Sequence, residues 1–325
     1  DEAVYAMLCR ADTTGVFQLE GGGMRSLIKQ LAPDRFEDLM ALVALYRPGP
    51  LSAGMHVEYA ERKHGRRAVS YPHEDLEEIL GPTYGIMVYQ EQVMQIAVRM
   101  AAYSMADADL LRQAMGKKIR AKLMVHREKF IQGCIDNGYA ERLGTDLFEL
   151  MEPFADYGFN ASHACAYGYI AYQTAFLKAH HPVEYMSAIL TSVRDDKDRK
   201  PFYLNACRLM GLEVLPPDVN ESEQDFAPVT SGEPKIRYGL SAVRNVGSGA
   251  VQQIIEARRA KGTFTGYADY CRKVEPSVLT KKVLESLIYA GAFDSFGYRR
   301  RGLVENQDKV SVPIAAERKA EAAGQ

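Results

Sequence analysis

Residues 28–50 have the sequence IKQLAPDRFEDLMALVALYRPGP, and this stretch shows most clearly how the chain folds. Apolar side chains recur every three or four positions, which is the spacing of one face of an α-helix. At 47–50 two prolines around a glycine stop the helix and are expected to force an extended, stiff turn. Similar patterns continue to about residue 195, so the sequence predicts a mainly α fold. The apolar positions are Ile28, Leu31, Phe36, Leu39, Met40 and Val43.

The other expected elements are mostly helices joined by short turns. The best strand candidate in the first half is 85–89, a short apolar run that precedes a helical pattern. Two short strands are predicted within 226–240, around a turn at Ser231-Gly232. Helices are expected at 90–102, 109–115, 117–134, 167–179, 201–210 and 278–290, with one more after the glycines at 247–249.

A charged run at 194–200 changes the composition and indicates a domain boundary. The last residues are rich in Ala, Glu and Lys and have little to bury. The predicted division is a multi-helix domain with a few short strands at 1–200, a connecting segment with a short β-hairpin at 201–240, a small helix-hairpin-helix domain at 241–300, and a charged helical or disordered tail at 301–325.

The composition is that of an ordinary globular protein. Of the 325 residues, 47% are hydrophobic and 25% are charged, which suffices for two or three domains with cores. The longest apolar runs fall far short of the roughly 20 residues of a membrane helix, and no signal-peptide pattern opens the chain. Five scattered cysteines form no Cys-x-x-Cys pair, which indicates free thiols. We therefore expect a soluble, cytoplasmic protein with no membrane partner.

The net charge of −2 excludes a polycation, so any nucleic-acid binding depends on local basic clusters. The segment 112–129 holds seven basic residues and one acid, and smaller clusters lie at 62–67 and 299–301. In the first cluster an arginine fork, mobile lysines and a glycine that permits close approach are the groups that a triphosphate pocket needs. A solvated basic helix face is the alternative. The residues concerned are Arg112, Gly116, Lys117 and Lys118.

A second candidate site is the segment 157–167, which gathers aromatic, amide, hydroxyl and imidazole groups around a glycine turn. Asn160 and His163 lie near a predicted helix start, with Ser162 as the expected N-cap. Such a turn can stack on a base or sugar and donate to a phosphate from the helix N-terminus. The alternative is a capped helix whose tyrosines belong to the core.

Residues 243–255, VRNVGSGAVQQII, have the Gly-x-Gly hairpin and following apolar helix of a helix-hairpin-helix motif. The glycines leave backbone N–H groups open to a phosphate at the helix N-terminus, which gives contact with DNA of any sequence. An ordinary glycine-rich helix start is the alternative, and the central serine departs from the apolar residue often found there. The predicted DNA-binding residues are Arg244, Asn245, Gly247, Ser248 and Gly249.

Asp107 and Asp109 have the Asp-x-Asp spacing of carboxylates that bridge two metal ions. They lie at the start of an apolar-periodic helix, so we interpret them as capping acids that favour the helix dipole. The acids at 195–198 belong to a solvated charged run. No catalytic triad, His-Glu-x-x-His or Walker-type loop occurs in the sequence. We therefore predict no catalytic residue and no metal ligand in this chain.

Taken together, five segments resemble the alpha subunit of bacterial DNA polymerase III, a C-family replicative polymerase, in an actinobacterial-like form. The resemblance runs in order from about residue 1 to residue 300. It implies that residues 1 to about 240 are the fingers region and that a DNA-binding and clamp-binding region begins at 241. The segments are 13–20, 44–50, 84–94, 111–118 and 157–167.

The resemblance also implies a pocket for the triphosphate of the incoming nucleotide. Where relatives commonly carry a second arginine and a lysine, this chain has Gln113 and Ala161, which implies a lower pocket charge. The positions that match the family's nucleotide pocket are Arg112, Lys117, Lys118, Asn160, His163 and Arg47.

The family's catalytic aspartates belong to a palm domain that is expected to precede Asp1, so the chain alone is expected to be inactive. In the full-length enzyme those aspartates would hold Mg²⁺, and the partners would be primer-template DNA, dNTP and replisome subunits including the sliding clamp. The nuclease-like amino-terminal domain is expected to lie outside the chain, and the clamp-binding peptide would begin near Gln325. A start inside a helix and without Met favours a piece of a longer protein. The alternative is a stand-alone nucleic-acid-binding or scaffold module with no nucleotide site.

Overall fold

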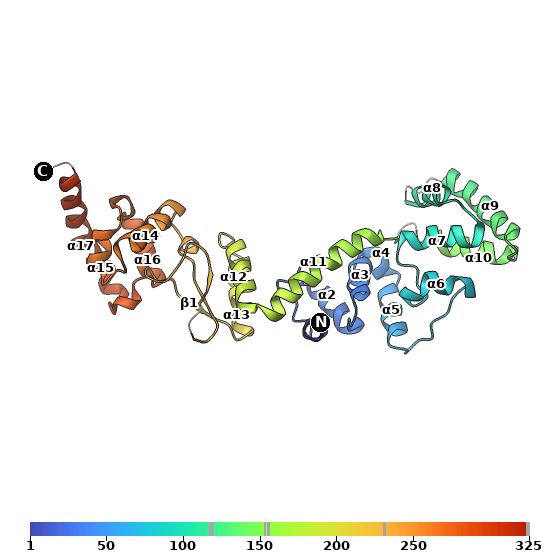
Figure 1. The fold of residues 1–325 in the computed structure, drawn as a ribbon, viewed down its shortest axis with the longest axis horizontal. Helices are drawn as coiled ribbons and strands as arrows, with labels where there is room; N and C mark the ends of the chain where they lie inside the picture. The colour runs from blue at the N-terminus through green and yellow to red at the C-terminus, as the bar shows by residue number, and fades with distance from the viewer. Residues whose placement is uncertain (117–119, 153, 155–156, 230–231, 323–325) are drawn as a thin grey trace. The chain divides into compact units, whose positions relative to one another are not determined.

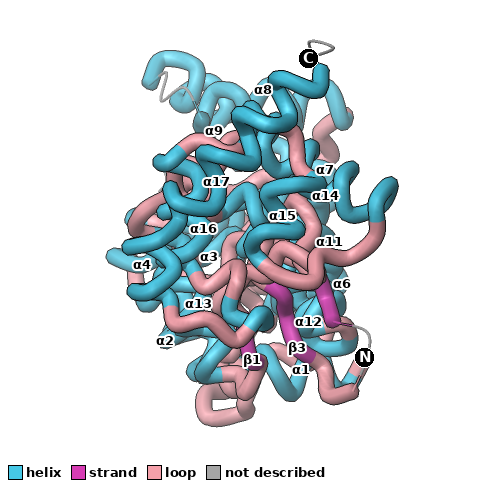
Figure 2. The backbone as a smooth tube through the Cα atoms, turned by 90° about the vertical axis from the view of Figure 1, so that its left-hand side faces the viewer, coloured by secondary structure: helices cyan, strands magenta, loops and turns pink. Residues whose placement is uncertain are grey.

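The computed structural model describes residues 1–116, 120–152, 154, 157–229 and 232–322. Helices dominate these residues, and the strands form one small sheet (Figures 1 and 2). The prediction of a mainly α fold is therefore confirmed. The chain divides into two compact units, Asp1–Ala179 and His180–Gln325. Among the described helices, none is long and apolar enough to cross a membrane.

Unit 1 contains two cores, and the first is built around α3. Helix α3 ends at Leu45, as the prolines at 48 and 50 predict. The extended turn expected at 47–50 is wrong beyond Arg47, because Pro48 begins a further short helix, where its missing N–H costs nothing. Helix α11 packs closely on α3, since a Cβ on Gly168 would lie 3.4 Å from the backbone nitrogen of Met40. The helices of this core are α1 (Glu2–Cys9), α2 (Gly22–Leu31), α3 (Phe36–Leu45), α5 (Met55–Lys63) and α11 (Ala161–His180), and the short helix α4 (Pro48–Ser52) lies between α3 and α5 in the sequence.

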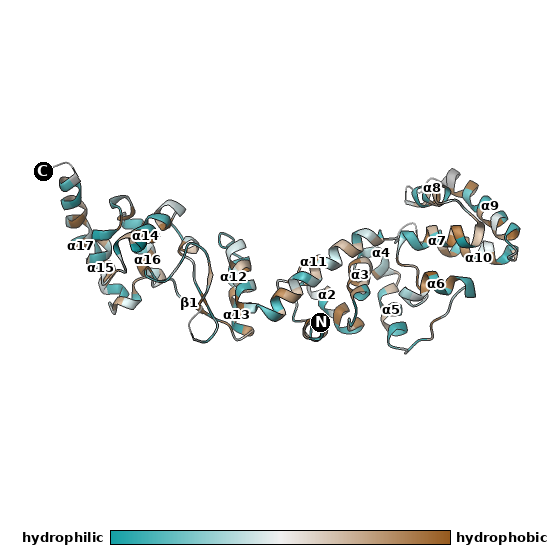
Figure 3. Cartoon of the chain, viewed as in Figure 1, coloured by the Kyte–Doolittle hydropathy of each residue, from teal (hydrophilic) through white to brown (hydrophobic). Residues whose placement is uncertain are grey.

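The second core of unit 1 lies between α7, α8, α9 and α10. Phe130 and Phe148 are fully buried there, with ring centroids 5.8 Å apart. Most of these helices carry both apolar and polar residues, as the colouring in Figure 3 shows, so one face of each can be buried. The elements are the 3-10 turns Glu74–Leu76 and Gly81–Thr83 and the helices α6 (Glu77–Leu80), α7 (Gln90–Ala101), α8 (Met105–Gly116), α9 (Arg120–Asp136) and α10 (Glu141–Met151).

The strand predicted at 85–89 is wrong. Only Tyr89 makes a bridge, to Phe159, and no strand is formed there. The backbone N–H groups of Val88 and Tyr89 donate instead to the side-chain oxygen of Gln92, at 2.8 and 3.0 Å. A side chain of the next helix thus takes the hydrogen bonds that a neighbouring strand would have supplied.

Unit 2 begins with two helices and a three-stranded sheet of order β1-β3-β2. The two strands predicted within 226–240 are confirmed as an antiparallel pair, β2 and β3, although Ser231 lies outside the described residues. Strand β1 was not predicted, and it pairs with β3 in parallel. Ile236 at the centre of β3 is fully buried. The elements are α12 (Pro182–Ser192), α13 (Arg199–Leu209), β1 (Glu213–Leu215), β2 (Ala227–Val229) and β3 (Lys235–Arg237).

A separate core in unit 2 is formed by the helices that follow the sheet. Phe293 lies at its centre against Tyr267 and Tyr270, at centroid distances of 5.2 and 5.0 Å. The C-terminal helix contributes Ile314 to this core, so the region expected to have little to bury begins beyond it. The elements are the 3-10 turns Leu240–Ala242, Pro276–Val278 and Asp294–Phe296 and the helices α14 (Ser248–Lys261), α15 (Tyr267–Lys273), α16 (Lys281–Ala290) and α17 (Arg300–Ala322).

Candidate functional site

The turn at 157–160 is attached to the start of α7, although the two are about 70 residues apart in sequence. The backbone N–H of Gln90 donates to the carbonyl of Phe159 at 2.8 Å, and the N–H of Phe159 donates to Val88 at 3.2 Å. The Gln90 side-chain amide also donates to the carbonyl of Gly158 at 3.3 Å. These bonds give the turn a fixed position on α7.

The N-terminus of α11 is held by Asn160 and Glu91. The side-chain oxygen of Asn160 accepts from the N–H of His163 at 2.7 Å, so Asn160 is the capping residue. The expectation that Ser162 caps the helix is wrong, because α11 begins at Ala161, one residue earlier. The carboxylate of Glu91 accepts from the amide of Asn160 at 2.7 Å and from the N–H of Ala161 at 2.8 Å.

Glu91 was not assigned a role from the sequence, although it lies in a segment that carries the family resemblance. An acid at a helix N-terminus is stabilised by the helix dipole and by the open N–H groups of the first turn. Glu91 therefore occupies part of the anion-binding position that the sequence suggested at this helix. Its partner is 70 residues away in the chain, so only the folded structure could reveal the contact.

Arg47, the residue that precedes α4, supports the same turn. Its Nε donates to the carbonyl of Ala44 at 2.8 Å, and a terminal nitrogen donates to the carbonyl of Tyr157. The guanidinium lies 4.5 Å from the centre of the Phe159 ring, a cation–π distance. Burial lowers the pKa of this guanidinium from its ordinary value. The contacts of Arg47 therefore position the turn.

His163 lies on the exposed first turn of α11. Its ring is 4.1 Å from the centre of the Tyr167 ring and 5.2 Å from that of Phe159. These three rings form a continuous aromatic group beside the capped helix start. The structure places these aromatic and amide groups together at the start of α11, and their role in binding stays a prediction.

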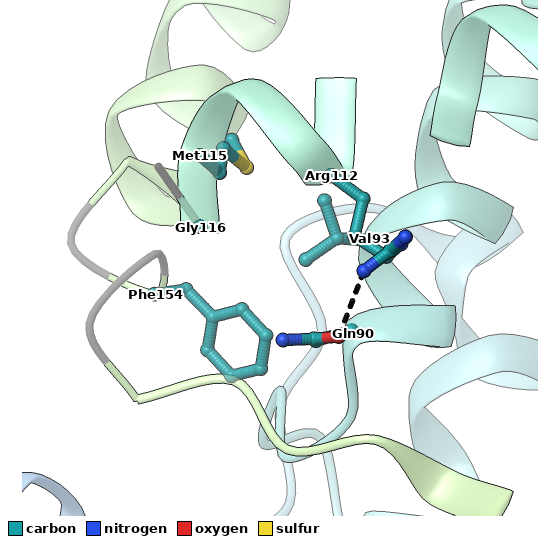
Figure 4. Close-up of a pocket in the computed structure, with 6 residues that line it drawn as sticks. All are labelled: Gln90, Val93, Arg112, Met115, Gly116 and Phe154. Carbon is teal, nitrogen blue, oxygen red and sulfur yellow. Dashed lines mark hydrogen bonds between the residues drawn. The ribbon is translucent and has the colours of Figure 1, made fainter. Parts of the chain in front are cut away.

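Arg112 is linked to the same turn through Gln90, as Figure 4 shows. One guanidinium nitrogen of Arg112 lies 3.3 Å from the Gln90 side-chain oxygen, and another lies 2.8 Å from the Asp109 carboxylate. The cavity between these side chains measures only about 10 Å³, so it holds at most one water molecule. A nucleotide would have to bind on the open surface beside Arg112. The lining residues are Gln90, Val93, Arg112, Met115, Gly116 and Phe154.

The structure thus brings four of the six predicted nucleotide-binding residues to one network around Gln90 and Glu91. Arg47, Asn160 and His163 belong to the turn and its support, and Arg112 joins through Gln90. The other two residues, Lys117 and Lys118, lie outside the described residues.

Asp107 makes the contacts that the capping interpretation predicts, whereas Asp109 lies beyond the first turn of α8 and pairs with the side chain of Arg112. The N–H of Asp107 donates to the Ser104 hydroxyl at 3.1 Å, and its carboxylate lies 3.0 Å from the Lys129 ammonium. The ammonium of Lys129 lowers the pKa of Asp107, and the guanidinium of Arg112 lowers that of Asp109. No group of three metal-ligating side chains is found among the described residues. The two acids are therefore engaged in helix contacts and do not form a two-metal site.

The predicted DNA-binding loop lies at the N-terminus of α14 in unit 2. Gly247 takes the N-cap position without a side-chain hydrogen bond to the first turn. The N–H groups of Ser248, Gly249 and Ala250 have no hydrogen-bond acceptor within the described part of the chain. Gly247, Ser248 and Gly249 are exposed, and a Cβ on either glycine would meet no atom within 4 Å. This helix start is therefore open to an anion.

The two predicted residues before this helix differ in their contacts. Arg244 is exposed beside the loop. Asn245 adopts a left-handed backbone with φ of 65°, which asparagine tolerates better than most residues. Its amide donates to the Ser286 hydroxyl of α16 at 3.2 Å. Asn245 therefore fixes the shape of the loop, and Arg244 supplies an accessible cation.

Comparison with known proteins finds one family match in each of the two units. Residues 1–138 match the sequence family "Bacterial DNA polymerase III alpha subunit finger domain", and residues 211–303 match the "Helix-hairpin-helix motif". The whole chain is 50% identical to DNA polymerase III subunit alpha of Mycobacterium tuberculosis and of Mycobacterium leprae. It is 45% identical to the Escherichia coli protein of the same name. The chain spans 28% of the length of each of these three relatives.

Proposed function

We propose that this chain, a relative of the bacterial DNA polymerase III alpha subunits, forms the fingers and the helix-hairpin-helix domain of a replicative DNA-directed DNA polymerase. In this proposal residues 1–200 are the fingers and 241–300 the DNA-binding domain, joined by 201–240 and followed by the tail at 301–325. Identity along the whole chain to polymerase subunits from distant bacteria is the support for this assignment. A role in replication would place the protein in the bacterial cytoplasm.

The fingers would position the incoming dNTP. Arg112, with Lys117 and Lys118, would neutralise charge on the triphosphate, because guanidinium and ammonium groups bind phosphate oxygens strongly. Asn160 and His163 would contact the same nucleotide from the start of α11. Arg47 would act through its support of the turn.

Mg²⁺ would have to be held by other parts of the full-length enzyme. Asp107 and Asp109, the closest match to a metal-bridging pair, are engaged with Lys129 and Arg112. The residues described here therefore do not fit a two-metal site. We expect no primer extension by this chain alone. The sliding clamp and other replisome subunits would be partners of the complete polymerase.

The helix-hairpin-helix domain would bind the backbone of primer-template DNA. The observation that carries this proposal is the open N-terminus of α14, with three N–H groups free of protein acceptors within the described residues. A phosphate oxygen is the ligand that such a helix start favours. Arg244 beside the loop would add attraction to the duplex without sequence preference. The predicted DNA-binding set is Arg244, Asn245, Gly247, Ser248 and Gly249.

The experiment is duplex binding by this chain in a salt series, followed by fluorescence anisotropy. Each phosphate contact should contribute about −0.9 to the slope of log K against log salt concentration. We expect a negative slope that corresponds to several contacts, and the same affinity for unrelated sequences. Absence of binding, or binding that does not change with salt, would contradict the proposal.

A stand-alone scaffold module is the alternative function. It would bind DNA through α14 but would have no use for the network around Gln90. The dNTP affinity of the complete polymerase separates the two functions. Only the fingers proposal predicts that replacing Arg112 weakens dNTP binding.

A further inference from the structure

A hollow of about 600 Å³ lies in unit 2, beside the loop that precedes α14. This volume is in the range of roughly 300–1,000 Å³ that is typical of ligand sites. Its walls come from the loop at 243–245, from one side of α16, and from the Pro216-Pro217 segment after β1. Lys200 of α13 and Tyr238, next to β3, complete the lining.

Hydrogen bonds between these segments hold the walls in place. The amide of Asn245 donates to the Ser286 hydroxyl at 3.2 Å, which joins the loop to α16. The Lys200 ammonium donates to the carbonyl of Ala242 at 3.1 Å. The guanidinium of Arg237 donates to the carbonyl of Pro216 at 2.9 Å, so the proline segment is fixed to the sheet. The hollow is therefore formed before any ligand arrives.

The lining combines an accessible aromatic ring with positive charge. Tyr289 of α16 is 65% exposed, so its ring is accessible to a ligand. Lys200 and Arg244 bring two cations, and no carboxylate occurs among the described residues that line the hollow. An aromatic face and two cations suit a ligand that has both a flat ring and a phosphate.

We propose that this hollow binds an unpaired nucleotide of single-stranded DNA. The base would stack on Tyr289, and the adjoining phosphates would contact Lys200 and Arg244. Asn245 and Ser286 present polar groups at the wall, where the edge of a base could lie.

Continuity with the loop favours DNA over a peptide. Arg244 and Asn245 line the hollow and also belong to the loop that would contact the duplex backbone. A strand that leaves the phosphate site of α14 would therefore pass the hollow. The path of the strand toward the hollow rests on the proposed function of α14, but the stacking contact itself depends on Tyr289.

The experiment uses the 325-residue chain and two fluorescent probes, read by anisotropy. One is an oligothymidylate of about 12 nucleotides, a length that suits one single-strand site. The other is a blunt duplex of about 20 base pairs, which offers phosphates but no unpaired base. The variants are Tyr289→Ala, Tyr289→Phe and the control Tyr298→Ala, since Tyr298 is also exposed but does not line the hollow.

We expect Tyr289→Ala to weaken oligothymidylate binding about tenfold, the loss of one base–aromatic stack. Tyr289→Phe should retain the affinity, because it keeps the ring, and Tyr298→Ala should match the wild type. Duplex affinity should be unchanged in all three variants. An oligothymidylate affinity that Tyr289→Ala leaves unchanged would overturn the inference, as would equal losses for both probes.

Two further results separate this inference from the proposed function. Failure of the wild type to bind duplex, with Tyr289-dependent binding of oligothymidylate, would contradict the phosphate site at α14 and keep the hollow. A short glutamate-rich peptide that binds through Tyr289, while oligothymidylate does not, would identify the hollow as a peptide site and overturn the inference.

Discussion

Replacing Gly247 and Gly249 by alanine should separate DNA binding from folding. A Cβ at either position meets no atom within 4 Å, and neither glycine has a positive φ. Gly249 lies within α14, where alanine stabilises by about 0.4–1 kcal/mol by restricting the unfolded chain. Gly247 is the N-cap, where alanine is less favourable than glycine, and this cost offsets the gain at Gly249. The free energy of unfolding of the double variant should therefore stay within about 1 kcal/mol of the wild-type value.

The same two methyl groups would stand where a phosphate approaches the first turn of α14. If they remove one hydrogen bond to a charged phosphate, binding loses about 1.5–3 kcal/mol. This loss raises Kd roughly tenfold to 150-fold. Anisotropy with a labelled duplex measures the affinity, and thermal denaturation of the same samples measures the fold.

Gly302→Ala is the matched control, because Gly302 is an exposed helical glycine with open space around its Cα. Gly302→Ala should leave the duplex affinity unchanged and should alter the free energy of unfolding only by the gain of about 0.4–1 kcal/mol that alanine brings within a helix. A stable double variant with wild-type duplex affinity would refute the phosphate site. A double variant destabilised by much more than about 1 kcal/mol would refute the conclusion that both glycines are surrounded by open space.

Three other outcomes are expected. Lys63→Met should lower the free energy of unfolding by up to about 3–5 kcal/mol, since the Lys63 side chain is 4% exposed and its loss leaves the fully buried Asp38 with only the more distant Arg35, at 3.8 Å, as a cationic partner; chemical denaturation checks this. Adding Asp38→Asn should recover part of the loss. Glu91→Gln should lower it by about 0.5–2 kcal/mol, the range of a helix cap, in the same assay. A hydrogen bond from Tyr139 lowers the pKa of Asp75, and one from Lys273 lowers that of Asp269. The stability that these two carboxylates contribute is therefore present above about pH 4 and is lost as pH falls further. Melting temperatures that stay constant in acid would contradict this.

Regular helices and loop chemistry could be predicted from the sequence because both depend on local pattern. The apolar spacing before Arg47 gave α3, and the glycines at 247–249 gave the start of α14. The antiparallel strands β2 and β3 were also predicted, since a turn signal separates them. Strand β1 is only three residues long, too short for a periodic signal, and its partner follows the β2 segment.

The network of the candidate nucleotide site could not be predicted in the same way. Its bonds join Gln90 and Glu91 to a turn near residue 160, and no local pattern records such a pairing. The residues 85–89 have strand-like composition, yet the N–H groups of Val88 and Tyr89 donate to Gln92, and those of Gly85 and Ile86 donate to the preceding turn, so none of these four needs a neighbouring strand. Side-chain hydrogen bonds decided both cases: they are long-range at the turn near residue 160 and local at Gln92.

The most direct test of the central claim is nucleotide dependence in the complete polymerase that contains this chain. Single-nucleotide incorporation would be measured against dNTP concentration for the wild type, for Arg112→Ala and for Arg142→Ala, an arginine whose side chain is 92% exposed. We predict that Arg112→Ala raises the apparent Kd for dNTP roughly tenfold or more, the loss of a charged hydrogen bond, with unchanged primer-template affinity. Arg142→Ala should behave as the wild type. An unchanged apparent Kd for dNTP in Arg112→Ala would contradict the claim that these fingers position the triphosphate.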